Sequence, residues 1–416
     1  MPTIITARRL LTDIGSVEYP VLTVADDGTI EDISSDPIAL EHETATLTAA
    51  FFDIHTHGAL GHDVMSASAA ELHAMQRFLA ERGVAHYLPT TVTAPIDSTL
   101  RALESLANAI EAGPNPVEAQ PVGIHLEGPF LSHTKRGVHP SDLLQPPSIE
   151  LFTRFYEAAL GNIAVLTIAP EPHAWLATDT SLKGTGFSPS MNPAEQQGPL
   201  APEGSPALDL IRHATSLGIR VSLGHSNATA AQTRTAISAG AVSATHTFNA
   251  MRPLDHREPG ILGVTLDEAK LYAELICDGI HVAPELVRVW LRSKGTDRAI
   301  LITDAMSAAG MPDGNYKLGA LDVHVSQGRA VLADDLARGK ETLAGSVLTM
   351  DRAVANLQRF THASLADATR LASHNPAALL GRPELTRLAP GSPANLNRFD
   401  SAGRLAGTWI RGELIS

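Results

Sequence analysis

The stretch FFDIHTHG, residues 51–58, ends an apolar run with two histidines, His55 and His57. Side chains two positions apart on a β-strand point to the same face of the sheet, so both imidazoles would lie on one face. Two imidazoles on one face can hold one metal ion, and they can equally be two polar residues in a turn. Which of these applies depends on what the rest of the chain places beside the pair.

The composition limits the classes of partner. The chain has 416 residues, of which 44% are hydrophobic and 18% charged, and its formal net charge is −14. This charge argues against a nucleic-acid groove or an anionic membrane surface as the main partner, while it leaves a small anionic substrate open. Cys277 is the single cysteine, and no apolar run reaches transmembrane length. We therefore expect a cytoplasmic globular protein without disulfides.

Strand-like apolar runs alternate with helical patterns through the middle of the chain. The helical patterns include 66–83, which ends in the usual helix stop Arg-Gly, 97–113 and 283–295. Eight strands in such an alternation predict a (β/α)8 TIM-like barrel, which helical segments at 343–360 and 364–381 would close. The candidate strands span residues 47–54, 84–92, 121–127, 162–171, 219–225, 241–248, 271–279 and 298–305.

Both ends of the chain differ from this middle part. Residues 19–33 contain two extended runs around Asp27-Gly28, which is a hairpin pattern, and the last residues alternate apolar side chains with Gly and Pro. These features predict a small β-sandwich domain formed by both termini. A stretch at 184–206, rich in Gly, Pro and Ser, predicts a long loop between barrel elements. The expected division is 1–50 and 376–416 for the β-sandwich and 51–375 for the barrel.

Polar residues follow six of the eight candidate strands. They are His55, His57, His125, Glu127, His225, His246, Asn249, Asp278, His281 and Asp304. In a barrel the carboxyl ends of the strands meet at one rim, where active sites of this fold lie. Imidazoles with a carboxylate suit Zn²⁺ or Fe²⁺, and a nearby Asp can act as general base. The sequence therefore predicts a metal-dependent hydrolase of an amide or a related bond.

Several short blocks occur in a characteristic order between about residue 51 and residue 350. They are HTHG, HLEGPF, GHSNAT, THTFNAM, DGIHV, TDAMSAAG and LAGSVLTM. With these blocks the chain resembles the amidohydrolase superfamily and, within it, the N-acetylglucosamine-6-phosphate deacetylases. HLEGPF followed by GHSNAT and THTFNAM is specific to the deacetylase group. The resemblance implies hydrolysis of the N-acetyl group of an amino-sugar phosphate, and it implies that the terminal β segments form the second domain of that family.

The resemblance also implies roles for individual residues. Glu127, His225 and His246 would hold the principal divalent metal, Asp304 would be the general base and later the acid, and His139 would polarise the acetyl carbonyl. The sugar phosphate would be bound by Asn249, Ala250, His256, Arg257, His281, Leu343, Ala344 and Gly345. In such enzymes Arg257 and His256 would reach the phosphate in the partner subunit, which implies a homodimer.

His55 and His57 can form a second metal site beside the principal one. A carboxylate has two oxygens, so Glu127 can bridge an ion on His225 and His246 and another ion on His55 and His57. We therefore expect one or two divalent ions per chain. The competing hypothesis is that the pair only shapes its loop or hydrogen-bonds the attacking water.

The sequence leaves the exact substrate and several residue roles open. The substrate can be the galactosamine epimer, or the chain can be a non-catalytic sugar-phosphate-binding homologue. Glu127 can cap a turn, Asp304 can cap a helix, and Arg257 can be a surface charge paired with Glu258. We expect His125 to pack inside the barrel rather than to hold a metal. More distant amidohydrolases commonly use a carboxylated lysine, and no lysine stands at the end of the strand 162–171.

Overall fold

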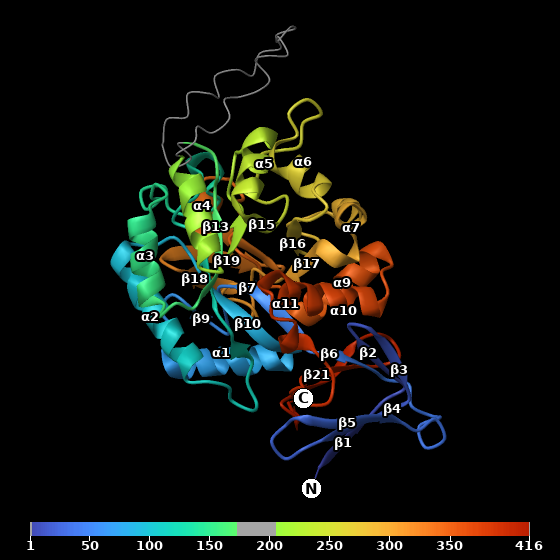
Figure 1. Ribbon diagram of the computed structural model, residues 1–416. Helices are drawn as coiled ribbons and strands as arrows, with labels where there is room; N and C mark the ends of the chain where they lie inside the picture. Colours follow the sequence, from blue (N-terminus) through green and yellow to red (C-terminus); the bar gives the residue numbers. More distant parts are fainter. Residues whose placement is uncertain (1, 173–204, 416) are drawn as a thin grey trace.

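The computed structural model describes residues 2–172 and 205–415, and within these ranges eight parallel strands of a nine-stranded sheet form the barrel (Figure 1). In order around the sheet they are β7 (Phe51–Thr56), β10 (Val84–Thr91), β12 (Ile124–Glu127), β13 (Ile163–Ile168), β14 (Arg220–Leu223), β15 (Ala241–Ala244), β16 (Tyr272–Ile276) and β17 (Ala299–Ile302). The sheet closes where the Asp304 N–H donates to the carbonyl of His55 at 2.9 Å and the His57 N–H donates to the carbonyl of Ala305 at 2.7 Å. The predicted (β/α)8 barrel is confirmed.

Helices surround this barrel (Figure 1). They are α1 (Ala69–Glu81), α2 (Ile96–Glu111), α3 (Ile149–Ala158), α4 (Pro206–Ser216), α5 (Ala230–Ala239), α6 (Gly260–Asp267), α7 (Pro284–Arg298), α9 (Met350–Thr361), α10 (Leu365–Ala372) and α11 (His374–Leu380). Helix α1 shows why such segments fold locally. Ser68 and Glu71 form a capping box at its start, Met75 and Leu79 are buried on one face, and Gly83 follows its end with a φ of +85°.

Strands from both termini pair below the barrel, where Figure 1 shows the N- and C-terminal ends. One sheet contains β1 (Thr3–Thr6), β4 (Pro20–Val24) and β5 (Ile30–Ser35), and the other contains β23 (Glu413–Leu414), β22 (Leu405–Ile410), β21 (Leu396–Phe399), β6 (Thr46–Ala49), β2 (Arg9–Thr12) and β3 (Gly15–Glu18). Leu22, Leu47 and Trp409 share one apolar cluster between them. The chain therefore carries additional β-sheets formed by both termini.

The candidate strand 47–54 is in fact two strands, because β6 ends at Ala49 and β7 begins at Phe51. The first strand joins the terminal sheet and the second joins the barrel. The division at 50/51 and 375/376 stays a prediction, and α11 runs across the second of these positions. Most of the predicted loop 184–206 lies outside the described residues, and Pro206 already begins α4.

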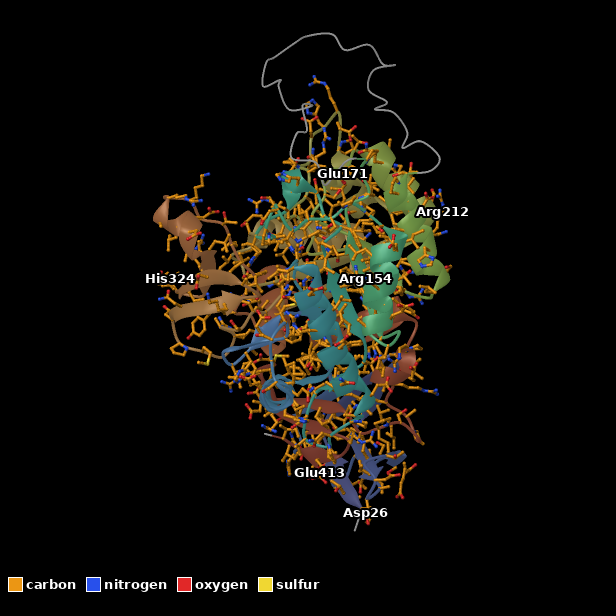
Figure 2. All side chains as sticks on the ribbon, turned by 90° about the vertical axis from the view of Figure 1, so that its left-hand side faces the viewer. Asp26, Arg154, Glu171, Arg212, His324 and Glu413 are labelled. Carbon is orange, nitrogen blue, oxygen red and sulfur yellow. The ribbon has the colours of Figure 1, made fainter. Side chains whose placement is uncertain are left out.

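A small β-sheet that the sequence analysis did not predict lies between β17 and α9. It consists of β18 (Gly314–Leu318), β19 (Leu321–Ser326) and β20 (Arg329–Leu332), and it is followed by α8 (Ala333–Ala337). Figure 2 shows it at the side of the barrel, where His324 of β19 is labelled. Leu318 and Val323 of this sheet pack against Val138 and Met306, so the sheet lies beside the carboxyl ends of the barrel strands.

Shorter elements complete the described chain. They are β8 (Gly58–Ala59), β9 (His62–Asp63), β11 (Gln120–Pro121), η1 (His133–Lys135) and η3 (Pro383–Thr386). Among the helices of the described residues, none is long and apolar enough to span a membrane.

A buried carboxylate links β7 to the residues that follow β17, where the barrel closes; we call this junction the seam. Asp53 on β7 accepts hydrogen bonds from the hydroxyl of Thr303 at 2.5 Å and from the N–H groups of Thr303 and His55 at 3.3 Å each. Burial raises the pKa of Asp53 to about 6, although these donors oppose that shift.

Replacing Asp53 by alanine should lower the free energy of unfolding by about 1–3 kcal/mol, because it leaves buried donors on both sides of the seam without an acceptor. Asp53→Asn keeps one acceptor and should cost less. Urea denaturation measures both changes, with the exposed Asp209→Ala as the matched control. An alanine variant as stable as the control would mean that Asp53 does not fasten the seam.

Candidate active site

Most of the sequence-predicted site residues line one cavity at the carboxyl ends of the barrel strands. Its volume is about 340 Å³. The predicted residues that line it are His57, Glu127, His139, His225, His246, Asn249, Ala250, His281, Asp304, Leu343 and Gly345. His55 lies beside them, fully buried, with its Nε2 3.3 Å from the Nε2 of His57. Glu341, Thr342 and Leu318 of the unpredicted β-sheet region also line it, together with Val92, Gly137 and Val138.

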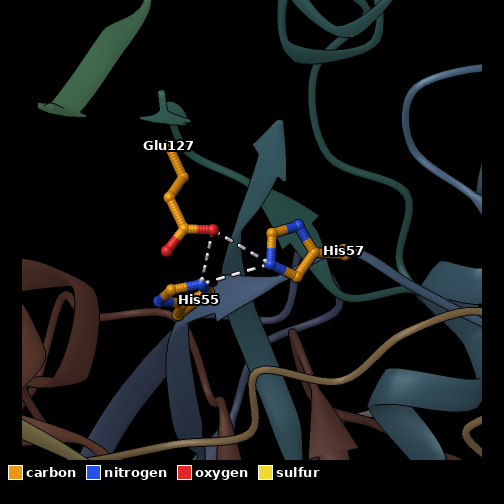
Figure 3. A group of neighbouring side chains, drawn as sticks. All are labelled: His55, His57 and Glu127. Atoms are coloured by element: carbon orange, nitrogen blue, oxygen red, sulfur yellow. Dashed lines mark hydrogen bonds and ion pairs between the residues drawn. The ribbon is translucent and has the colours of Figure 1, made fainter. Parts of the chain in front are cut away.

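The two oxygens of Glu127 face different pairs of imidazoles. Oε1 lies 3.2 Å from the Nε2 of His225 and 3.1 Å from the Nε2 of His246. Oε2 lies 3.4 Å from the Nε2 of His57 and 3.6 Å from the Nε2 of His55 (Figure 3). The donor atoms in each group of three lie within 4.8 Å of one another. Nitrogen and carboxylate oxygen donors converging in this way fit one or two divalent ions that share Glu127.

Hydrogen bonds to main-chain carbonyls orient two of these imidazoles. The Nδ1 of His57 lies 2.9 Å from the carbonyl oxygen of Thr90, and the Nδ1 of His225 lies 3.1 Å from that of Lys135. A carbonyl only accepts, so each Nδ1 carries a proton and each Nε2 is the ring nitrogen that faces the site. Loss of the proton from Nε2 leaves the tautomer that metal ligation requires.

A carboxylate orients the third imidazole. The Nδ1 of His55 donates to Oε2 of Glu274 at 3.4 Å, and Glu274 is fully buried on β16. The sequence analysis missed Glu274, although a charged residue inside the apolar run LYAELICDG is an unusual feature. The Nδ1 of His246 is buried without a hydrogen-bond partner among the described residues.

Opposite charges in the site favour each other's ionised forms. Burial would raise the pKa of Asp304, but His55 and His57 hold it well below its usual range. The Oδ1 of Asp304 lies 3.2 Å from the Nε2 of His57. In the same way burial would lower the pKa of His57, but Asp304 and Glu127 raise it to about 9. Asp304 is therefore a carboxylate at neutral pH, able to accept a proton.

His139 presents a hydrogen-bond donor to the cavity. Its Nδ1 accepts from the N–H of Thr93 at 3.2 Å, so in the neutral ring the proton is on Nε2. This Nε2 lies 3.7 Å from the Oε2 of Glu127. Burial, and then the charge of His225, hold the pKa of His139 well below its usual range. The ring is thus a neutral donor beside the candidate metal ligands.

The backbone is left-handed at three of the ionisable residues that line the cavity. The φ angles are +47° at His225, +29° at His246 and +49° at Asp304. Non-glycine residues adopt this region rarely, and such strain is concentrated at functional sites. Each residue stands just after a barrel strand, where the left-handed turn directs its side chain into the cavity.

Besides the buried His55, three predicted residues do not line the cavity in this chain. His256 and Arg257 are exposed on the segment between β15 and α6. Glu258 accepts from the N–H groups of Ala230 and Gly260 rather than pairing with Arg257. Ala344 is fully buried in the apolar cluster around Met306.

His125, which we expected to pack, contributes no ligand to either group of three. Its Nε2 lies 2.7 Å from the hydroxyl of Thr167, and its Nδ1 lies 3.2 Å from the carbonyl oxygen of Ile54. Both ring nitrogens are therefore occupied inside the barrel.

A closed (β/α)8 barrel with a buried histidine–carboxylate cluster at its rim defines a class, the barrel hydrolases that use a divalent metal. The chain belongs to the amidohydrolase family, whose model matches residues 46–415. An N-acetylgalactosamine-6-phosphate deacetylase of Escherichia coli O157:H7 is 36% identical to it over the full length of both chains. An N-acetylglucosamine-6-phosphate deacetylase of Vibrio furnissii is 34% identical, with 98% of this chain and 94% of the relative covered.

Solved structures of deacetylases also match the chain over nearly its whole length. The crystal structure of N-acetyl-D-glucosamine-6-phosphate deacetylase from Mycobacterium smegmatis matches with a TM-score of 0.84 at 30% identity, covering 100% of each chain. The deacetylase from Thermotoga maritima matches with a TM-score of 0.81 at 28% identity, covering 100% of this chain and 99% of that one.

Metal analysis of protein purified with excess divalent ion should give about two ions per chain, as bridged two-metal sites hold. The double change His55→Asn and His57→Asn should bring this to about one ion in a folded protein, because Glu127, His225 and His246 remain. His324→Asn, on β19 and outside both groups of metal-ligating atoms, is the control and should leave the content unchanged. A native chain that never exceeds one ion would refute the second site.

Proposed function

We propose that this chain hydrolyses the N-acetyl group of N-acetyl-D-glucosamine 6-phosphate, giving D-glucosamine 6-phosphate and acetate. The observation that carries the proposal is the cavity in which the anionic Asp304 and the neutral donor His139 flank the Glu127 cluster. The relatives that match the chain over nearly its whole length are deacetylases of N-acetylhexosamine 6-phosphates.

The metal centre is part of this proposal. Glu127, His225 and His246 would hold the principal ion, and His55 and His57 would hold the second one, with zinc or ferrous iron as the best-suited metals. When bound, such an ion polarises an amide carbonyl and lowers the pKa of water. The remaining chemistry belongs to the side chains of the protein.

Two of those side chains handle protons and charge. Asp304 takes a proton from the attacking water and later gives it to the amine that leaves. The Nε2–H of His139 donates to the acetyl oxygen as negative charge develops there. His281, whose Nδ1 lies 2.7 Å from the carboxylate of Asp278, presents its Nε2 to the sugar. Asn249, Ala250, Leu343 and Gly345, which line the cavity, form the rest of the sugar site.

The proposal also covers the residues that bind the phosphate, the oligomeric state and the cellular compartment. Arg257 and His256 reach the phosphate of the substrate bound in the other subunit of a homodimer, and the protein works in the cytoplasm. A guanidinium suits phosphate because its planar fork matches two oxygens.

N-Acetyl-D-galactosamine 6-phosphate is the second candidate substrate. It is favoured by the relative from Escherichia coli O157:H7, which is named for that epimer. A non-catalytic sugar-phosphate binder would be expected to lack a general base, and here Asp304 faces the cavity.

Acetate release tests the function directly. The substrates to compare are the glucosamine and galactosamine epimers and the unphosphorylated sugar, each with and without a chelator. The proposal expects the highest kcat/KM for the phosphorylated glucosamine derivative and loss of rate after metal removal. A higher value for the epimer would select the second candidate, and no acetate from any of them would refute deacetylation.

Asp304→Asn should retain the fold and bound metal but lose about 10²–10⁴-fold in kcat, because the amide cannot accept the proton of the attacking water. Initial rates and metal content measure the two effects together. Asp322→Asn, on the exposed face of β19, serves as the control. A near-native rate for Asp304→Asn would remove Asp304 from the role of base.

Arg257→Ala should raise KM for the phosphorylated sugar far more than for the unphosphorylated sugar, since only the first loses a charge-assisted contact. If the contact crosses subunits, mixing Arg257→Ala with Asp304→Asn should restore activity, because one site of the mixed dimer is intact. The exposed Arg234→Ala is the control. A monomer that shows no complementation would contradict the shared site.

A further inference from the structure

A further buried carboxylate, besides Glu127 and Asp304, lies at the rim just after the end of β13. Glu171 is 7% exposed, and Figure 2 shows it at the end of the molecule opposite to Glu413 and Asp26 of the terminal strands. Its Oε2 accepts from the hydroxyl of Ser226 at 2.6 Å, and its Oε1 accepts from the N–H of Asn227 at 2.7 Å. Glu171 belongs to neither group of metal-ligating atoms.

The two partners of Glu171 directly follow the metal ligand His225. The hydroxyl of Ser226 also accepts from the N–H of Ala228 at 3.0 Å, so its single hydrogen is available for Glu171. His225 itself has a left-handed φ of +47°, a conformation that its surroundings must maintain. The contacts of Glu171 therefore hold the turn that directs the imidazole of His225 toward Glu127.

The same turn is tied to the loop after β15. The N–H of Ser226 donates to the carbonyl of Ala250 at 3.0 Å, and the N–H of Arg252 donates to the carbonyl of Ser226 at 2.9 Å. Asn249 and Ala250 line the cavity on this loop. One carboxylate on the β13 side of the rim thus connects a metal ligand with the proposed sugar site.

We propose that Glu171 is a positioning residue that fixes the loops after β14 and β15, and through them the geometry of His225 and of Asn249–Ala250. The role in sugar binding rests on the proposed function, whereas the role in metal binding does not. Both oxygens of the carboxylate accept, so an amide at this position would place a donor against Asn227 or Ser226. A shorter carboxylate would not span both partners.

The test compares the affinity for Zn²⁺, measured by chelator competition without substrate, across Glu171→Ala, Glu171→Gln and Ser226→Ala. Partners that orient metal ligands typically contribute about 10–100-fold in metal affinity. We expect such a loss for Glu171→Ala and smaller losses for the other two changes. In turnover assays Glu171→Ala should also raise KM.

Glu118 provides a matched control. It is 2% exposed and binds His73 at 2.6 Å and Arg77 at 2.7 Å, near the amino end of β10 and away from the cavity. Glu118→Gln should lower the free energy of unfolding without changing the affinity for Zn²⁺. If the Glu171 variants behave in the same way, Glu171 is only structural and the inference fails.

The outcomes separate this inference from the proposed function. Reduced Zn²⁺ affinity in a chain that releases no acetate would support the positioning role and refute the function. Unchanged affinity in an active deacetylase would refute the positioning role alone. If Glu171→Ala does not fold, the Zn²⁺ affinities of Glu171→Gln and Ser226→Ala still test the positioning role, because both variants keep most of the local packing. Native affinity in both of them would overturn the inference.

Discussion

Each oxygen of the buried Glu127 carboxylate faces its own pair of imidazoles. The fold must therefore bring these four imidazoles to the same place. A carboxylate that is 3% exposed needs compensating partners, because burying an unpaired charge is costly. The partners come from β7, β14 and β15, which are far apart in the sequence. A closed parallel barrel brings the carboxyl ends of these strands to one rim. Closure at the seam between β7 and β17 is therefore a condition for the site, since it brings Asp304 to His57.

Hydrogen bonds to neighbouring segments of the chain hold the strained residues of the site. Left-handed backbone conformations in non-glycine residues cost on the order of 1–3 kcal/mol each. At Asp304 the N–H donates to the carbonyl of His55 and the carbonyl accepts from the N–H of Ser346 at 2.7 Å. At His225 the carbonyl accepts from the N–H of Ser132 at 2.9 Å. These contacts with neighbouring segments thus stabilise the left-handed backbone at Asp304 and His225.

The order of strands and the polar residues at their ends could be predicted from the sequence, because apolar runs followed by His, Glu or Asp are local patterns. The break between β6 and β7 could not be predicted, because both sides of Ala50 are buried and apolar. The roles of Glu274 and Glu171 could not be predicted either. Glu274 contacts His55 from 219 positions away along the chain, and Glu171 contacts Ser226 from 55 positions away. Such contacts depend on barrel closure and leave no local periodicity.

The charges around the cavity bear on how a phosphate could be bound. Among the described residues that line the cavity there is no lysine or arginine, whereas Glu127, Asp304 and Glu341 contribute carboxylates. A phosphate dianion on the sugar needs a cationic partner, and a guanidinium supplies the strongest match. Arg257 is exposed and forms no ion pair with a described side chain. The proposed homodimer accounts for both features, because it would bring the Arg257 of a second copy to a cavity whose described lining has no cation.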